Sequence, residues 1–426
     1  MTSPTSMGVS PDPIMAHHPG DAVPRARVVG LVAFSWGLCA FFPVGLMYLH
    51  LLLMTLAIGL SADRSARLRR VLGNACVLPA VTWLAWTLLA ALVGALSDDL
   101  ATRLFHVLRV LLVWALGMAL WRREAVLALT GFLVGAVLAA TIVAAHHLWG
   151  LPDWAIWRSL IAPVNNFSSG NMISMAVAAG LFFFLAIRQH DAGQGRWLAA
   201  AGAAALGLTV VLHAVSRNAQ ILLILAPMAA VLYRYRSLRA TGLGLLLALA
   251  LAAIAWQFSP QIQSRFAEVT SNLHAVTAEA SYNSSIGIRW RMGQEAFEQM
   301  VAHPLFGTGV GSWLPHWKQA WAQMQPNLPA QEHLRFAEIN NPHNDYLLAG
   351  METGVPGMLL LGWTLARFIR LGWRSASPAG GILVVLAVAM AATAMVNAPL
   401  RDAALGMTLL WLMGVGVAVR RESAHG

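Results

Sequence analysis

Residues 126–148 read VLALTGFLVGAVLAATIVAAHHL and contain no Asp, Glu, Lys or Arg. A helix of this length rises roughly 34 Å, which is enough to cross the hydrocarbon core of a bilayer, about 30 Å thick. The whole chain shares this character, because 58% of its 426 residues are hydrophobic, only 11% are charged and the mean hydropathy is +0.63. Soluble domains do not have such a composition. The sequence therefore predicts an all-α polytopic membrane protein.

About twelve apolar segments are long enough to be transmembrane helices. The first two adjoin at Phe42-Pro43-Val44-Gly45. The predicted segments cover residues 28–43, 44–60, 71–96, 104–121, 126–148, 170–187, 197–214, 220–233, 242–258, 346–366, 379–396 and 404–419. Helices 1 to 9 therefore occupy residues 27–258, and helices 10 to 12 occupy residues 346–419.

The distribution of arginine predicts the orientation, because short loops rich in Lys and Arg stay on the cytoplasmic side. Most of the 28 basic residues fall in alternate short loops, such as those at residues 64–70 and 234–239. The acidic residues lie mostly on the other side. Both termini are therefore expected in the cytoplasm, residues 1–26 as a disordered, Pro-rich tail and residues 420–426 as a short one.

The net charge of +10 does not indicate a nucleic-acid partner, because the basic residues are spread over separate short loops without a continuous stripe. Membrane topology and contact with anionic lipid headgroups explain it better. Cys39 and Cys76 both lie inside predicted spans. They therefore predict neither a disulfide framework nor a Cys-rich metal site.

Nearly all the extramembrane mass lies in one predicted external segment, residues 259–345. A loop of this length is usually functional or disordered, and this one shows signs of order. Residues 288–302 have the pattern of a helix, residues 304–311 that of a Gly-rich turn, and residues 314–324 that of a second short helix. Their aromatic side chains predict a lid that rests at the membrane interface, where such rings are favoured; among them are Trp290, Phe297, Trp317 and Trp321.

The sequence Asn341-Pro342-His343-Asn344-Asp345-Tyr346 places an imidazole where this segment re-enters the membrane. Asn341 suits an N-cap, Pro342 suits the first helical position, and Asp345 suits the positive end of the helix dipole. These positions predict that His343 lies in the first helical turn, where the dipole keeps the ring neutral near pH 7. The sequence leaves two roles open for His343, a general base or a capping and packing histidine.

Four arginines stand out near the same boundary. Arg217 lies in a tight turn between two apolar helices, and boundary charges of this kind tend to be functional, although an arginine that contacts lipid headgroups is the simpler alternative. Arg289 and Arg291 begin the loop helix and point about 200° apart, so only one of them is expected to face a given site. Arg265 stands alone among polar residues, and surface placement is its simpler interpretation.

Several motifs in this order resemble the O-antigen ligase and polymerase superfamily. They are the Ser216-Arg217 turn, the helix with Arg289 that leads to Pro304-Leu305-Phe306-Gly307-Thr308-Gly309, and His343-Asn344-Asp345-Tyr346-Leu347 followed by Glu352-Thr353-Gly354. The resemblance covers residues 205–360 by motif and the whole chain by topology. It implies a GT-C-like glycosyltransferase architecture. Gly293 departs from the family pattern, which has Trp there, and Trp290 is a candidate to replace the missing ring.

The resemblance also implies an activity: transfer of a glycan from undecaprenyl pyrophosphate to a sugar hydroxyl of lipid A–core. The reaction would take place on the periplasmic face of the bacterial inner membrane, without a cofactor. His343 would accept the proton of the acceptor hydroxyl, with Asn344 and Asp345 in support. Four arginines would bind the pyrophosphate through charge-assisted bonds: Arg217, Arg289, Arg291 and Arg265.

A metal-independent, inverting reaction is expected. Asp98-Asp99 is the only adjacent acidic pair, no Asp-X-Asp occurs, and acids at a helix boundary usually face solvent. Three alternatives stay open. Two are enzymes of the same superfamily, an O-antigen polymerase and a protein O-oligosaccharyltransferase. The third, a transporter of lipid-linked glycan, is expected to show symmetric half-repeats and polar residues in the middle of the membrane.

Overall fold

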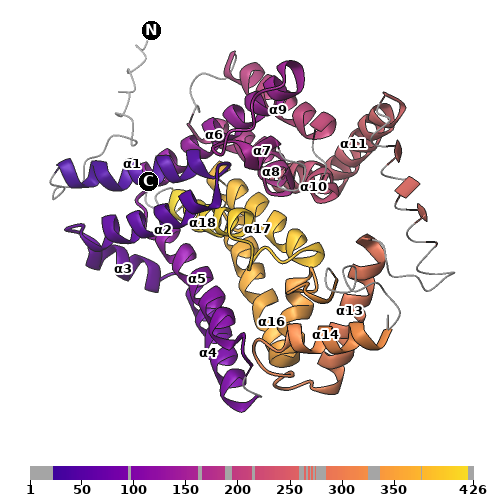
Figure 1. Ribbon diagram of the computed structural model, residues 1–426. Coiled ribbons are helices and arrows are strands. Elements are labelled where there is room, and N and C mark those ends of the chain that lie inside the picture. The colour runs from indigo at the N-terminus through magenta and orange to yellow at the C-terminus, as the bar shows by residue number, and fades with distance from the viewer. Residues whose placement is uncertain are drawn as a thin grey trace, which may run out of the picture.

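The computed structural model describes residues 23–94, 97–161, 166–187, 194–213, 216–258, 285–324, 336–375 and 377–420, together with 263–264, 267–268, 270–271 and 274. Within these ranges the regular secondary structure is entirely helical (Figure 1). The helices are α1 (Val23–Cys39), α2 (Val44–Gly59), α3 (Arg64–Leu72), α4 (Val77–Val93), α5 (Leu100–Met118), α6 (Arg122–Trp149), α7 (Arg158–Ile161), α8 (Asn166–Ile187), α9 (Gln194–His213), α10 (Arg217–Tyr235), α11 (Leu238–Phe258), α13 (Ser285–Ala302), α14 (Trp313–Met324), α16 (Asp345–Trp373), α17 (Pro378–Val396) and α18 (Ala404–Arg420). The predicted all-α class is confirmed.

Each predicted apolar segment coincides with one of these helices. By length and composition, four described helices are able to cross a membrane, namely α5, α6, α10 and α17, or up to five spans if α2 and α3 count as one. The chain is thus an α-helical, multi-pass membrane protein. The count of twelve spans stays a prediction. The predicted N-terminal tail lies outside the described residues up to residue 22, and α1 begins at Val23.

The predicted basic loop after α2 is the short helix α3, bent by 110° from α2. Its Arg67 is only 2% exposed and pairs with both carboxylate oxygens of Glu124, at 2.6 and 2.8 Å. The Nε of Arg67 also donates to Asp63, at 2.9 Å. This arginine therefore joins α3 to α6 inside the protein instead of facing lipid headgroups, because two carboxylates replace the water that its charge would lose.

Helices α17 and α18 form the centre of the bundle (Figure 1). α18 packs against α5, α6 and α17, and residues 405–419 of this helix are all buried. α16 packs against α4 and α17 and also against α13. Because α16 contacts both, it joins the predicted external segment to the helix bundle.

α16 has a kink at Gly354, where φ is 74°. The turn at residues 304–311 docks on this kink: Val355 N donates to Pro304 O, and Thr308 N donates to Met351 O, both at 2.8 Å. A Cβ at Gly354 would lie 2.1 Å from Leu305 O. The Pro-Leu-Phe-Gly-Thr-Gly and Glu-Thr-Gly motifs therefore form one contact, which needs glycine both for its positive φ and for space.

The predicted helices of the external segment are present as α13 and α14. Three tryptophans of α14, Trp313, Trp317 and Trp321, are fully buried and lie ring against ring, 5.6 Å apart between neighbouring centroids. Trp313 and Trp317 also donate to the carbonyl oxygens of Ile339 and Phe336. The prediction that the α14 rings rest at the membrane interface is wrong, because they form a small core that holds the chain leading to His343.

Candidate functional site

Arg217 is the first residue of α10. Ser216 caps this helix, since its hydroxyl oxygen accepts a hydrogen bond from Ala219 N, at 3.3 Å. The Arg217 side chain is 29% exposed, and its Nη2 lies 3.2 Å from a carboxylate oxygen of Glu268. The cap fixes the start of the helix, so the guanidinium is held at a boundary where solvent still reaches it.

Arg289 and Arg291 point to different surroundings, as their spacing on α13 predicts. Arg291 makes ion pairs with Glu295, at 3.1 Å, and with Glu298, at 3.4 Å. The Arg289 side chain is exposed, but neighbouring protein atoms still withdraw part of it from water and lower its pKa, and the positive charge of Arg217 lowers it further. Arg289 is therefore influenced by the charge of Arg217, whereas Arg291 is paired with carboxylates of its own helix. Arg265 lies outside the described residues.

His343 lies just before α16, not in its first turn. The N-cap is Asn344, whose side-chain oxygen accepts from Leu347 N, whereas Asn341 accepts from the backbone N–H of His343, both at 2.9 Å. His343 itself has φ of 53°, a left-handed conformation that is uncommon outside glycine and found more often for Asn, Asp and His. The predicted cap at Asn341 is wrong, because Pro342 and the turn at His343 delay the helix by three residues.

The His343 turn is hydrogen-bonded to the end of α17 and to the segment that joins α17 and α18. His343 Nδ1 lies 2.9 Å from the side-chain oxygen of Asn397, and Asn344 Nδ2 donates to Met395 O, at 3.0 Å. Asp345, which is buried, accepts from Leu400 N, at 2.9 Å. Both residues predicted to support His343 therefore hold its backbone in place.

Electrostatic effects link the three proposed site residues. The pKa of His343 is lowered, chiefly by burial and also by the positive charge of Arg289, against an opposing effect of the bond to Asn397. The positive charge of Arg217 in turn lowers the pKa of Arg289. Residues from α10, from α13 and from the turn before α16 thus lie within reach of one another's charge. The neutral imidazole expected from a helix dipole is instead favoured by burial and a neighbouring guanidinium.

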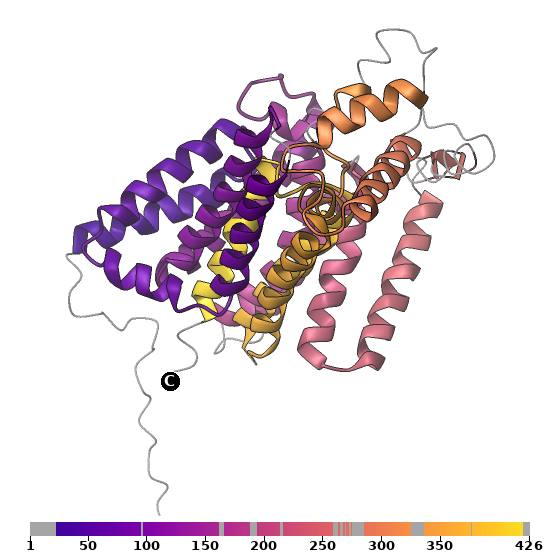
Figure 2. The same ribbon diagram turned by 90° about the horizontal axis from the view of Figure 1, so that it is seen from below.

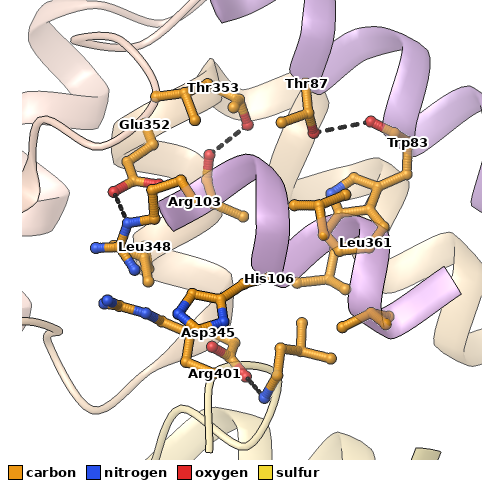
Figure 3. A pocket seen from close by; sticks show the side chains of 15 residues that line it. Trp83, Thr87, Arg103, His106, Asp345, Leu348, Glu352, Thr353, Leu361 and Arg401 are labelled. Atoms are coloured by element: carbon orange, nitrogen blue, oxygen red, sulfur yellow. Dashed lines mark hydrogen bonds and ion pairs between the residues drawn. The ribbon is translucent and has the colours of Figure 1, made fainter. Parts of the chain in front are cut away.

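A cavity of about 60 Å³ lies behind the His343 turn, between α4, α5 and α16 (Figure 3). In it, Arg103 Nε lies 2.9 Å from Glu352, and Arg103 Nη2 donates to Asn340 O, at 3.2 Å. Arg401 also donates to Asn340 O. Two arginines distant in sequence therefore hold the residue that precedes Asn341, and this cluster positions the turn from behind.

The cluster around Arg103 was not predicted, although the sequence carries a signal for it. Arg103, His106 and Arg109 recur every three residues in an otherwise apolar helix, and charges in such a segment are generally paired or functional. Arg109 is 3% exposed, and it donates to Tyr48 Oη at 2.8 Å and to Arg401 O at 2.9 Å. These contacts could not be read from the sequence because the partners come from distant helices.

Trp290 does not replace the ring that the family has at the position of Gly293. Its side chain is 57% exposed. A Cβ at Gly293 would lie 3.7 Å from a side-chain carbon of Leu347 of α16, an ordinary van der Waals distance, so Leu347 and not Trp290 covers this position. The suggested substitution of one ring by the other is therefore wrong.

Residues 202–362 match the protein-family model described as O-antigen ligase. The matched range contains Arg217, Arg289, His343 and the contact between the Gly-rich turn and the α16 kink. No curated protein matches the chain. Among the described residues, no group of three or more His, Cys, Asp and Glu side chains is arranged to hold a metal ion. Over residues 202–362, the chain is similar to the O-antigen ligase/polymerase superfamily.

Proposed function

We propose that this protein is an O-antigen ligase that transfers a glycan from undecaprenyl pyrophosphate to a sugar hydroxyl of lipid A–core. The observation that supports the proposal most directly is the electrostatic coupling of Arg289 to both Arg217 and His343. Two guanidinium groups suit a pyrophosphate, since their planar donors match its oxygens, and a neutral imidazole suits the removal of a hydroxyl proton.

In the proposed reaction the acceptor oxygen attacks the anomeric carbon of the donor sugar. The new C–O bond forms while the bond to the pyrophosphate oxygen breaks, and its electron pair stays on the pyrophosphate. The hydroxyl proton passes to Nε2 of His343. Arg217 and Arg289 stabilise the charge that develops on the leaving group. Direct attack of this kind inverts the configuration at the anomeric carbon.

The test is a transfer assay with purified protein, lipid-linked O-antigen donor and lipid A–core acceptor. We expect an inverted linkage, and undiminished product in the presence of EDTA. A retained linkage would reject direct attack, and activity lost to EDTA but restored by magnesium or manganese would reject the metal-independent route. A strain without the gene separates ligase from polymerase: it would accumulate long polymer on the lipid carrier for a ligase, and would show core capped by one unit for a polymerase.

We also propose twelve spans, a GT-C-like architecture and both termini in the cytoplasm. The support is that α14 and the basic loop between α10 and α11 lie at opposite ends of the bundle (Figure 2). This arrangement favours a site on the periplasmic side. A reporter enzyme that is active only outside the cytoplasm is expected to be inactive when fused after Gly426, and an active fusion would contradict this orientation.

Glu268 forms an ion pair with Arg217, one of the two arginines that we propose bind the pyrophosphate. Replacement of Glu268 by Gln is expected to lower the KM for the lipid-linked donor by up to about fivefold, because an exposed ion pair is worth about 0.2 to 1 kcal/mol and would no longer compete. Steady-state kinetics at fixed acceptor concentration would measure the change. An unchanged KM in Glu268→Gln would show that Arg217 does not bind the donor in the step that KM reports.

The lowered pKa of His343 predicts the pH dependence. A base must be neutral to act, so kcat/KM is expected to fall only below about pH 6.5, the ordinary value for histidine. In Arg289→Gln the nearby positive charge is lost, which favours imidazolium. The acid limb of the pH profile, where kcat/KM falls, should therefore move to higher pH. Arg291→Gln is the matched control, since Arg291 pairs with Glu295 and Glu298, and its limb should stay in place. If the acid limbs of the wild type, Arg289→Gln and Arg291→Gln coincide, the charge of Arg289 does not act on His343 and the prediction is wrong.

A further inference from the structure

We propose that Asn397 is a positioning residue that fixes the tautomer and the ring orientation of His343. The inference rests on the proposed function, in which His343 is the general base. Asn397 ends α17 as its C-cap residue, and its backbone N–H donates to Thr393 O, at 2.8 Å. The side-chain oxygen lies 2.9 Å from His343 Nδ1.

This bond decides which ring nitrogen can accept a proton. An amide oxygen only accepts hydrogen bonds, so Nδ1 must carry the hydrogen and donate it. The lone pair of the neutral ring is then on Nε2, at the far side of the ring from Asn397. Orientation of an imidazole through its second nitrogen is a general device in sites where the first nitrogen does the chemistry.

The surroundings make Asn397 the side chain on which the ring orientation depends. The backbone of the turn is held independently, through Asn344 to Met395 O and through Asp345 to Leu400 N. Neither of these bonds touches the imidazole. The charged group that acts on the ring is Arg289, which repels imidazolium and offers no acceptor.

An amide has a second advantage over a carboxylate here. A carboxylate would also accept from Nδ1, but its negative charge would stabilise imidazolium and raise the pKa of His343. With Asn397 the ring is oriented and still stays neutral near pH 7. The left-handed backbone of His343 fits such a role, because conformations of this kind persist only where several contacts determine them.

The experiment compares Asn397→Leu with Asn397→Asp by complete pH–rate profiles of glycan transfer. Asn397→Leu has similar size and no acceptor, and we expect kcat to fall by about tenfold or more, with little change in the KM for the donor. Asn397→Asp keeps the acceptor, so it should retain most of kcat at alkaline pH while the acid limb moves upward. A role in folding alone would not move this limb.

Tyr346→Phe is the matched control. Tyr346 Oη donates to Ala391 O, at 3.2 Å, so this variant also removes one hydrogen bond between α16 and α17 without touching the imidazole, and its pH profile should stay unchanged. An active Asn397→Leu with the wild-type profile, or an Asn397→Asp limb that does not move, would overturn the assignment. If His343→Ala is inactive in the same assay, such results reject only the role of Asn397; if His343→Ala is active, the general base itself is rejected.

Discussion

Replacement of His343 by Ala is expected to lower the rate of glycan transfer by about 10²- to 10⁴-fold, the usual contribution of a positioned base. A sugar hydroxyl is a poor nucleophile, and His343 is the described histidine whose charge state is coupled to Arg289 and, through it, to Arg217. The loss should appear in kcat, with little effect on the KM of the donor, because the pyrophosphate is proposed to bind the arginines. The measurement is product formation under steady-state conditions with purified protein.

His303→Ala is the control for this experiment. His303 lies in the same external segment, at the end of α13, and its side chain is exposed, so its loss should leave transfer near the wild-type rate. Both variants should elute from size-exclusion chromatography as the wild type does. A His343→Ala protein that forms product at more than about a tenth of the wild-type rate would remove the imidazole from the essential machinery.

Replacement of Glu352 by Ala is expected to destabilise the protein by about 3 to 5 kcal/mol, the usual cost when one partner of a buried ion pair is lost. Glu352 is 6% exposed and lies 2.9 Å from Arg103. It also accepts hydrogen bonds from the backbone N–H groups of Gly311 and Trp313. The substitution would leave the Arg103 charge buried and would release the turn that docks on the α16 kink.

Thermal unfolding in detergent would measure this loss, with Glu298→Ala as the control. Glu298 also pairs with an arginine, Arg291, but its side chain is 60% exposed, and exposed pairs contribute at most about 1 kcal/mol. We therefore expect a large drop in the unfolding midpoint for Glu352→Ala and almost none for Glu298→Ala. Equal midpoints would mean that water reaches the Arg103 pair and that it does not hold the fold together.

The helices were predictable because their cause is local. An apolar run in a membrane must satisfy its backbone polar groups within itself, so each run became a helix, and even α13 and α14 were found within a few residues of their observed starts. The predicted start of α16 was wrong, because side-chain contacts outside this segment determine where the helix begins. Asn341 suits an N-cap in isolation, yet α16 begins at Asp345, where the links from Asn344 and Asp345 to the α17–α18 connection determine the start.

The candidate site also contains some residues that the sequence predicted and others that only the structure revealed. Arg217, Arg289 and His343 were named from their residue types, their order and a family resemblance. The choice of Arg289 over Arg291 required the structure, because Glu295 and Glu298 pair with Arg291. The role of Asn397 and the pairing of Arg103 with Glu352 were not predicted, since the partners lie 54 and 249 residues apart along the chain.

The sequence by itself determined an all-helical membrane protein, the approximate position of each helix and the superfamily to which residues 202–362 are similar, because hydropathy, helix periodicity and motif order are properties of single segments. Only the tertiary structure decided which guanidinium acts on the imidazole through its charge, which amide holds that ring, and that the tryptophans of α14 are buried. Those outcomes depend on distances between side chains of different helices, and packing of the whole chain sets such distances.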